Sequence, residues 1–293
     1  MSSTPAHWEA ELVLDAHARL GEGPVWSGQE SVLYWVDIDA ARVHRYDPAT
    51  GLDEELDVGE AVGAVAPRRS GGLVLALKSG FALTGAWPSP PRTLVDVEAD
   101  RPELRMNDGA CDTRGRFWAG TMHVAFEPAR GSLYRLDPSG AVRGMLEGVS
   151  ISNGIAWSPD NRVMYYVDTP SGGVDVFDFD LAGGTIDNRR RVLDVDPADG
   201  KPDGLVVDAE GFLWLALWEG WSVRRYGADG TLAAVVDVPC ARVTKCAFGG
   251  AGLDELYITT ASPDEPAVDQ LHAGGLFRAR PGVIGLPATP YAG

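Results

Sequence analysis

Short apolar runs of strand-like composition recur along this chain at a nearly constant spacing. Aliphatic and aromatic residues dominate each run, and no long stretch has the 3.6-residue period of a helix. Successive runs begin 40 to 49 residues apart, a period typical of β-propeller blades rather than of helical repeats. Six runs share this character, at residues 33–36, 73–76, 117–120, 164–167, 213–216 and 256–259.

Each apolar run has a turn and another short strand in front of it and further strands behind it. Clusters of Gly, Asp, Asn, Ser and Pro precede the runs, as in hairpin turns. A third strand follows, for example at 43–46, and most repeats have a fourth, for example at 191–194. Four antiparallel strands in each of six repeats predict an all-β fold, a six-bladed β-propeller. The first strands begin near Gly23, Gly63, Gly109, Gly154, Gly204 and Lys245.

The two ends of the chain indicate how the ring closes. The sixth repeat ends after its third strand, and the chain begins with an isolated apolar stretch at 11–15. An open ring would leave strand edges unpaired, which favours aggregation. We therefore expect the N-terminal strand to complete the sixth blade, and residues 1–293 to form a single propeller domain.

Charge and cysteine content narrow the range of partners. With 42 acidic against 25 basic residues, and a net charge of -17, the chain is a poor match for nucleic acid or an anionic membrane. Its three cysteines form neither a zinc motif nor an even disulfide framework, so a reducing cytoplasm is the expected location. The N-terminal residues lack the apolar run of a signal peptide, and no window is apolar enough to span a bilayer. We expect a monomer that acts on a small molecule.

Aligning the repeats places several polar residues at one position of the central channel. The first strand of each blade lines that channel, and the residue before its opening glycine is equivalent in all blades. Asp or Asn before Gly is also ordinary turn chemistry, which explains any one of these residues alone. A ring of close acids, however, repels itself unless a cation or a proton neutralises it. The residues at this position are Glu22, Val62, Asp108, Asn153, Asp203 and Thr244.

Oxygen ligands at this position predict a site for one divalent cation. Carboxylate and amide oxygens suit Ca²⁺, Mg²⁺ or Mn²⁺, and Zn²⁺ and Fe²⁺ are further options. The segment before Asp108 adds Arg105, with its fork of donors, and Asn107, with both donor and acceptor atoms. These two side chains could hold a polyhydroxylated ligand beside the cation, although a surface turn explains Arg105 by itself. The serines lack the sequence context of a nucleophile elbow, which argues against a Ser-His-Asp hydrolase.

The motifs taken together indicate a known family. The motifs occur in the same order as in the senescence marker protein/gluconolactonase family, which includes regucalcin and bacterial sugar lactonases, and the chain resembles this family over nearly its whole length. Each motif alone would be weak, and their common order makes the resemblance specific. The matching segments are 20–24, 105–109, 120–122, 152–154, 202–204 and 246–250.

This resemblance implies a function as well as a fold. It implies one divalent cation held by Glu22, Asn153 and Asp203, with Asp203 also serving as the catalytic acid and base. It implies substrate contacts by Arg105 and Asn107. The reaction would be hydrolysis of an aldonolactone, such as a gluconolactone, xylonolactone or arabinolactone, to the sugar acid. Whether Asp203 or a hydroxide held by the cation acts as the base stays open, as do the sugar and the metal.

One segment departs from the pattern of the resembling vertebrate proteins. They carry a substrate-contacting glutamate shortly after Gly-Thr-Met, and the corresponding place here is Ala125, flanked by His123 and Glu127. We expect His123 to be a candidate substrate contact in its place, although a lone loop histidine is more often simply solvated.

Two other functions stay open at this point. One is a regucalcin-like propeller that binds calcium or another divalent cation without catalysis. The other is a hydrolase of the same fold that acts on other esters, because fold alone does not determine the substrate. Arg105 and Asn107 favour the lactonase, because a cation buffer has no need of two ligand-binding side chains beside its metal.

Overall fold

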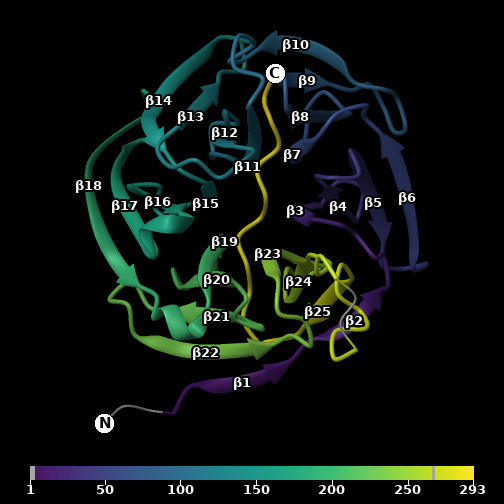
Figure 1. Cartoon of the computed structure of the whole chain (residues 1–293), viewed down its shortest axis with the longest axis vertical. Coiled ribbons are helices and arrows are strands. Elements are labelled where there is room, and N and C mark those ends of the chain that lie inside the picture. Colours follow the sequence, from purple (N-terminus) through teal and green to yellow (C-terminus); the bar gives the residue numbers. More distant parts are fainter. Residues whose placement is uncertain (1–3, 266–267) are drawn as a thin grey trace.

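In the structure, a computed structural model that describes residues 4–265 and 268–293, the regular secondary structure is almost entirely β-strand. Six sheets surround a central channel, and Figure 1 shows them as the blades of a closed ring. The predicted all-β, six-bladed propeller is therefore confirmed. Helical structure in the described ranges is limited to the short 3-10 turns η1 (Thr169–Ser171) and η2 (Pro197–Asp199), and neither could cross a membrane.

In blades one to four the strands follow one another outward from the channel in sequence order, and in blades five and six an N-terminal strand is added outside such a series. Blade one contains β3 (Gly21–Ser27), β4 (Val32–Asp37), β5 (Arg42–Asp47) and β6 (Leu52–Asp57). Blade two contains β7 (Val62–Pro67), β8 (Leu73–Leu77), β9 (Gly80–Leu83) and β10 (Arg92–Asp96). Blade three contains β11 (Leu104–Cys111), β12 (Phe117–His123), β13 (Gly131–Leu136) and β14 (Val142–Val149).

The second half of the ring repeats this order. Blade four contains β15 (Ser152–Trp157), β16 (Val163–Asp168), β17 (Gly173–Asp180) and β18 (Thr185–Asp194). Blade five contains β19 (Lys201–Val207), β20 (Leu213–Trp218), β21 (Ser222–Tyr226) and β22 (Leu232–Asp237). Blade six contains β23 (Val243–Gly249), β24 (Glu255–Thr260) and β25 (Leu276–Ala279). The predicted apolar runs are the second strands, which are mostly buried because they are covered on both faces by neighbouring blades.

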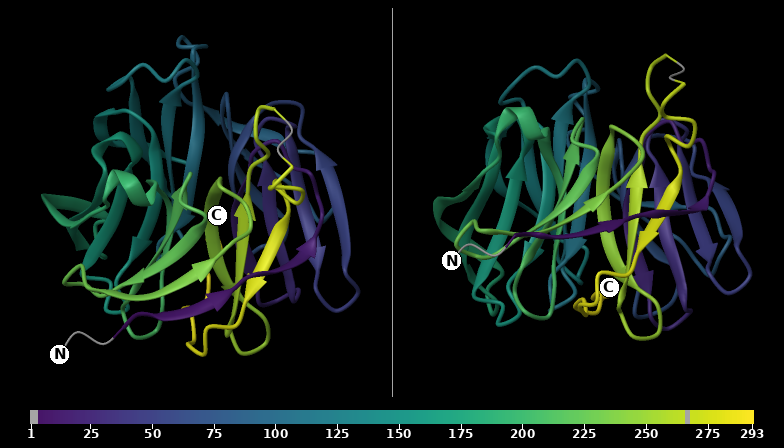
Figure 2. Two further views of the ribbon diagram at one scale, coloured as in Figure 1. Left: turned by 60° about the horizontal axis from the view of Figure 1, so that its bottom comes forward. Right: turned by 90° about the horizontal axis from the view of Figure 1, so that it is seen from below.

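The N-terminal segment closes the ring and extends beyond the closure. Strand β2 (Glu11–Leu14) pairs antiparallel with β25 and completes blade six, which confirms the predicted closure. Strand β1 (Ala6–Glu9), which the sequence did not predict, pairs in parallel with β22 and adds a fifth strand to blade five. Figure 2 shows this segment as a strap across the outside of two adjacent blades. It joins them through backbone hydrogen bonds rather than side-chain packing alone.

Buried aspartates in the turns anchor the blades. The side chain of Asp208 accepts hydrogen bonds from the backbone amides of Glu210 and Phe212, both at 3.0 Å, and from Trp214 Nε1 at 2.9 Å. Arg225 Nε donates a fourth at 2.8 Å. Asp112 has the same arrangement in blade three, with two turn amides, an arginine and a tryptophan as donors. These carboxylates connect the turn to the second strand.

The C-terminal segment crosses the end of the channel at which the inner strands finish (Figure 1). Ala209 N donates to Ile284 O at 2.9 Å in blade five, and Tyr291 N donates to Pro67 O at 2.8 Å in blade two. The segment therefore connects blades on different sides of the ring. Above it, the channel encloses a mainly apolar cavity of about 340 Å³ whose lining includes Ile155, Leu205 and Leu286. The path of the C-terminal segment across the channel was not predicted from the sequence.

Candidate functional site

The same irregularity occurs in the innermost hairpin of every blade. The register between inner and second strand shifts within a few residues of the position aligned from the sequence, for example between Glu22 and Val25 or between Asn153 and Ile155. The other blades shift there too. A β-bulge re-aims side chains and is often found beside functional sites. The repeat therefore builds one ring of re-aimed residues at the end of the channel where the inner strands begin.

Three carboxylates from different blades interact within this ring. Glu22, Asp108 and Asp203 are all buried, and neighbouring inner strands contact one another around the channel. Burial, and next the charge of Asp108, raises the pKa of Glu22 to about 8. Burial, followed by the charges of Glu22 and Asp108, raises the pKa of Asp203 well above its ordinary value. Each carboxylate therefore lies within electrostatic reach of the others, as expected of a convergent site.

Two of these carboxylates have an oxygen without a partner. Within residues 4–265 and 268–293, Asp203 Oδ1 and Asp108 Oδ2 are buried and accept no hydrogen bond. Leaving a buried polar atom unpaired is unfavourable, and native structures do so rarely. A cation at the centre of the ring would give Asp203 Oδ1 a partner and would offset the mutual repulsion of the acids. These residues therefore fit the divalent cation that the sequence predicts.

Asparagine side chains extend the ring toward the mouth of the channel. Asn153 Nδ2 donates to Thr169 Oγ1 at 2.9 Å, which leaves Asn153 Oδ1 to accept from Asn107 Nδ2 at 3.3 Å. Asn107 Nδ2 also donates to Ser152 O at 2.8 Å. Arg105 donates to Asn107 Oδ1 at 2.7 Å, so Arg105, Asn107 and Asn153 form one connected row. The sequence placed these residues at one site, and the structure brings them together.

The sixth blade contributes a positively charged side chain to the ring, from the residue next to the aligned one. Thr244, the aligned residue, donates to Gly21 O at 2.6 Å and so connects blades six and one. Lys245, its neighbour, points across the channel instead, and its ammonium is hydrogen-bonded to Asp108 Oδ1. The alignment drew attention to both residues but could not show this contact, because the bulge decides which of the two side chains enters the channel.

His123 lies at the mouth side of the same blade as Arg105. It is the last residue of β12, and second strands end where inner strands begin because the two run antiparallel. Its Nδ1 accepts from Ala125 N at 3.1 Å, and its Nε2 lies 3.8 Å from a Glu127 carboxylate oxygen. These contacts are with its own loop, so a contact with substrate stays a prediction.

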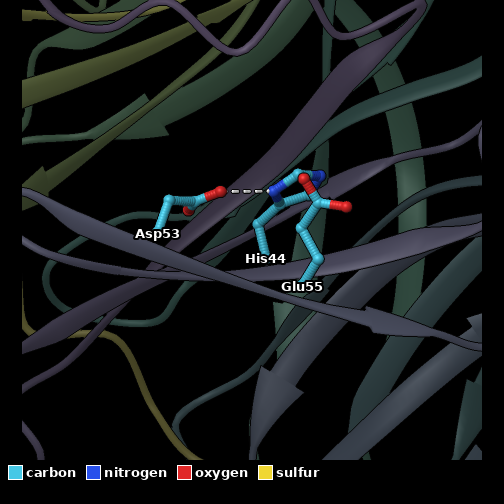
Figure 3. A group of neighbouring side chains, drawn as sticks. All are labelled: His44, Asp53 and Glu55. Carbon is cyan, nitrogen blue, oxygen red and sulfur yellow. Dashed lines mark hydrogen bonds and ion pairs between the residues drawn. The ribbon is translucent and has the colours of Figure 1, made fainter.

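A second group of possible ligands lies away from the channel, on the outer strands of blade one. Ligand atoms of His44, Asp53 and Glu55 come within 4.8 Å of one another (Figure 3). Asp53 is already bonded on both oxygens, to His44 Nδ1 at 2.6 Å and to Trp35 Nε1 at 3.2 Å. The His44 ring also stacks on Trp35, with centroids 3.8 Å apart. These bonds account for the group as a connection between strands of the blade.

Comparison with known proteins gives a consistent result over nearly the whole chain. Residues 20–262 match the SMP-30/Gluconolactonase/LRE-like region. Regucalcin from Gallus gallus is 40% identical over 97% of this chain and 98% of its own length. YvrE from Bacillus subtilis, whose name assigns it to the sugar lactone lactonases, is 36% identical over 97% of this chain and 99% of its own. A solved regucalcin from Agrobacterium tumefaciens, described as calcium-binding, has a TM-score of 0.93 at 27% identity and covers 99% of both chains.

Proposed function

This chain belongs to the SMP-30/gluconolactonase/LRE-like family, and we propose that it is a metal-dependent lactonase that hydrolyses a sugar lactone to the open sugar acid. The observation that carries the proposal is the set of buried, mutually repelling carboxylates with unpaired oxygens beside Asn107 and Arg105. The name of YvrE supports a sugar lactone as the class of substrate.

Glu22, Asn153 and Asp203 would hold the cation. Together they offer two negative charges and an amide oxygen, which suits a hard divalent ion and leaves positions for other ligands. Such an ion, when bound, supplies Lewis-acid polarisation of a carbonyl and stabilises the developing oxyanion. Calcium, zinc, manganese, magnesium and iron all accept this ligand set, so the identity of the ion is a matter for the experiment below.

The chain's own residues would then position the lactone and move a proton. Arg105 and Asn107 lie beside the proposed cation ligands and would donate hydrogen bonds to the hydroxyl or carbonyl oxygens of the sugar ring. Asp203 would take a proton from the water that attacks the carbonyl carbon. It would return the proton to the ring oxygen as the acyl C–O bond breaks, which yields the hydroxy acid.

Cation binding without catalysis is the second candidate function. It is favoured by the description of the Agrobacterium tumefaciens regucalcin as a calcium-binding protein. Arg105 argues against it, because burial lowers the pKa of its guanidinium against the opposing charges of Asp39 and Glu22, and its hydrogen bonds go to Asn107 Oδ1 and Met106 O rather than to an acid. Keeping an arginine there is unfavourable unless it serves a ligand.

Acid release from a panel of lactones and aryl esters tests these alternatives directly. The panel should include gluconolactone, xylonolactone, arabinolactone and an aryl acetate, each with chelator-treated protein and after addition of single metals. We expect lactone hydrolysis that vanishes with chelator and returns with one or more of the ions. Cation binding without turnover of any lactone would favour the second candidate, and preferential turnover of the aryl ester would favour a hydrolase of other esters.

A further inference from the structure

Lys245 spans the channel from one side to the other. It comes from β23 in blade six, and its partner Asp108 comes from β11 in blade three, on the opposite side of the ring (Figure 1). Its Nζ donates to Asp108 Oδ1 and to Gly109 O, the latter at 3.4 Å. Lys245 is 4% exposed and Asp108 is 1% exposed. A lysine is almost never this buried unless its charge is paired, so the contact is part of the fold.

The stem of Lys245 occupies space that blade five leaves for it. A Cβ atom added to Gly204 would overlap Cβ and Cγ of Lys245 and come within 2.9 Å of its Cα. Glycine at this position therefore allows the aliphatic stem to lie against the inner strand directly beside Asp203. Lys245 also lines the apolar cavity further along the channel.

The three carboxylates carry one negative charge more than a divalent cation would neutralise. Three buried carboxylates face the ring, and a divalent cation would neutralise two of them. Lys245 neutralises the third through its contact with Asp108.

We propose that Lys245 is a positioning residue that keeps Asp108 out of the ligand set of the cation. The site then presents Glu22, Asp203 and one amide oxygen, and leaves the coordination position nearest Asp108 for substrate. This inference rests on the proposed function, because it assumes that a cation binds in the ring. It concerns a residue for which neither the aligned repeat position nor the motif pattern provides a role.

Two changes of charge should shift cation affinity in opposite directions. In Lys245→Met the stem volume is kept, and Asp108 becomes a free carboxylate beside the cation. Fixed negative charge at the ligands tightens divalent binding, so the dissociation constant should fall on the order of tenfold or more. In Asp108→Asn the ammonium is left unpaired beside the cation, and the dissociation constant should rise on the order of tenfold.

The double variant Lys245→Met/Asp108→Asn is the matched control. It removes the pair together and leaves no unpaired buried charge, so its affinity should return to within about threefold of the parent. Isothermal titration of chelator-treated full-length protein with Ca²⁺ and with Mn²⁺ measures the dissociation constant of each ion for the parent and the three variants. We also expect kcat for the lactone to fall in Lys245→Met although the cation binds more tightly, because Asp108 then competes for the substrate position.

The outcomes separate this inference from the proposed function. Equal affinities in the parent and both single variants, or shifts in the same direction, would overturn the role of Lys245. The lactonase proposal would stand in that case, provided that the parent protein binds the cation. A parent that binds neither of these ions, nor Mg²⁺, Zn²⁺ or Fe²⁺, would overturn both. If Lys245→Met does not fold, Asp108→Asn and the double variant suffice, because the double variant must then bind about tenfold more tightly than Asp108→Asn.

Discussion

Asp203 lies near the start of the inner strand β19 and Asp208 directly follows its end, and the two are almost equally buried, at 5% and 0% exposure. They differ in their partners. Asp208 receives bonds from two backbone amides, a tryptophan and an arginine. One oxygen of Asp203 receives none from the described part of the chain, and the nearest charges to it include two further acids. Two aspartates in one blade therefore have opposite electrostatic environments.

The difference follows from the position of each residue on the blade. Asp208 lies in the turn between inner and second strand, where the turn amides and side chains of the outer strands can reach it. Asp203 lies at the bulge, where the strand edge faces the channel rather than another strand. Burial with a full set of donors makes a carboxylate part of the scaffold, whereas burial without them indicates a site that binds something else.

Replacing Asp203 should separate activity from stability. Asp203→Asn keeps the shape and an oxygen ligand but removes the charge and the proton-accepting group. We expect weakened cation binding and a loss of lactonase kcat on the order of 10²–10⁴-fold, the usual contribution of a general acid or base. Because the substitution also removes repulsion with Glu22, the metal-free protein should melt no lower than the parent. Initial rates at saturating metal and calorimetric melts measure the two effects, and full activity would contradict the proposed mechanism.

Asp208→Asn is the matched control in the same blade. It leaves Arg225 with a poorer partner in a buried network, so we expect destabilisation of about 3 kcal/mol. Its kcat/KM per folded molecule should stay within about twofold of the parent, because the change is at the far end of the strand from the ring. Loss of activity in folded Asp208→Asn would show that the two environments are not independent.

Substitutions of Asn107 and Arg105 sharpen the comparison within the channel itself. Neither belongs to the proposed ligand set of the cation, so we assign them to the substrate. Asn107→Ala and Arg105→Ala should lower kcat/KM about 10- to 100-fold, as expected for losing one or two hydrogen bonds to a substrate, while the metal dissociation constant changes little. A large loss of metal affinity in either variant would instead assign that residue to the cation.

The channel acids should make the metal-free protein less stable as pH rises. The pKa of Glu22 is raised to about 8 in the fold, above its value of 4.5 in an unfolded chain. The folded state therefore binds more protons between these values, and stability should fall by up to about 1.4 kcal/mol per pH unit for each such proton. Chelator-treated protein should melt higher at pH 6 than at pH 8. Glu22→Gln should reduce the slope, and saturating metal should abolish it, because the cation then replaces the proton.

Deleting residues 1–17 tests the scaffold without touching the channel acids. The deletion removes β1 and β2, exposes an edge of β25 and removes the segment that pairs with the outer strands of both blade five and blade six. A fall of several degrees in Tm is expected, since about 1 kcal/mol corresponds to a few degrees in a chain of this size. Metal affinity of the folded variant should stay close to that of the parent. An unchanged Tm would mean that ring closure contributes no stability.

The sequence by itself determined the repeat and therefore most of the architecture. Apolar runs at a constant spacing predicted the six second strands, and an isolated stretch at 11–15 predicted the closure that β2 makes. It also predicted which residues share the bulged position. Most of these residues are followed by a glycine, which marks the same place on each inner strand. Patterns of this kind are visible because they are local and are repeated in every blade.

Only the tertiary structure decided what each residue at that position faces. Lys245 and Asp108 are 137 positions apart and meet because blades six and three lie opposite one another once the ring has closed. The choice of Lys245 rather than Thr244 depends on the bulge, and the unpaired oxygen of Asp203 depends on the absence of a donor in the described channel. Partners across a channel are set by ring geometry and charge compensation, and neither leaves a periodic trace in the sequence.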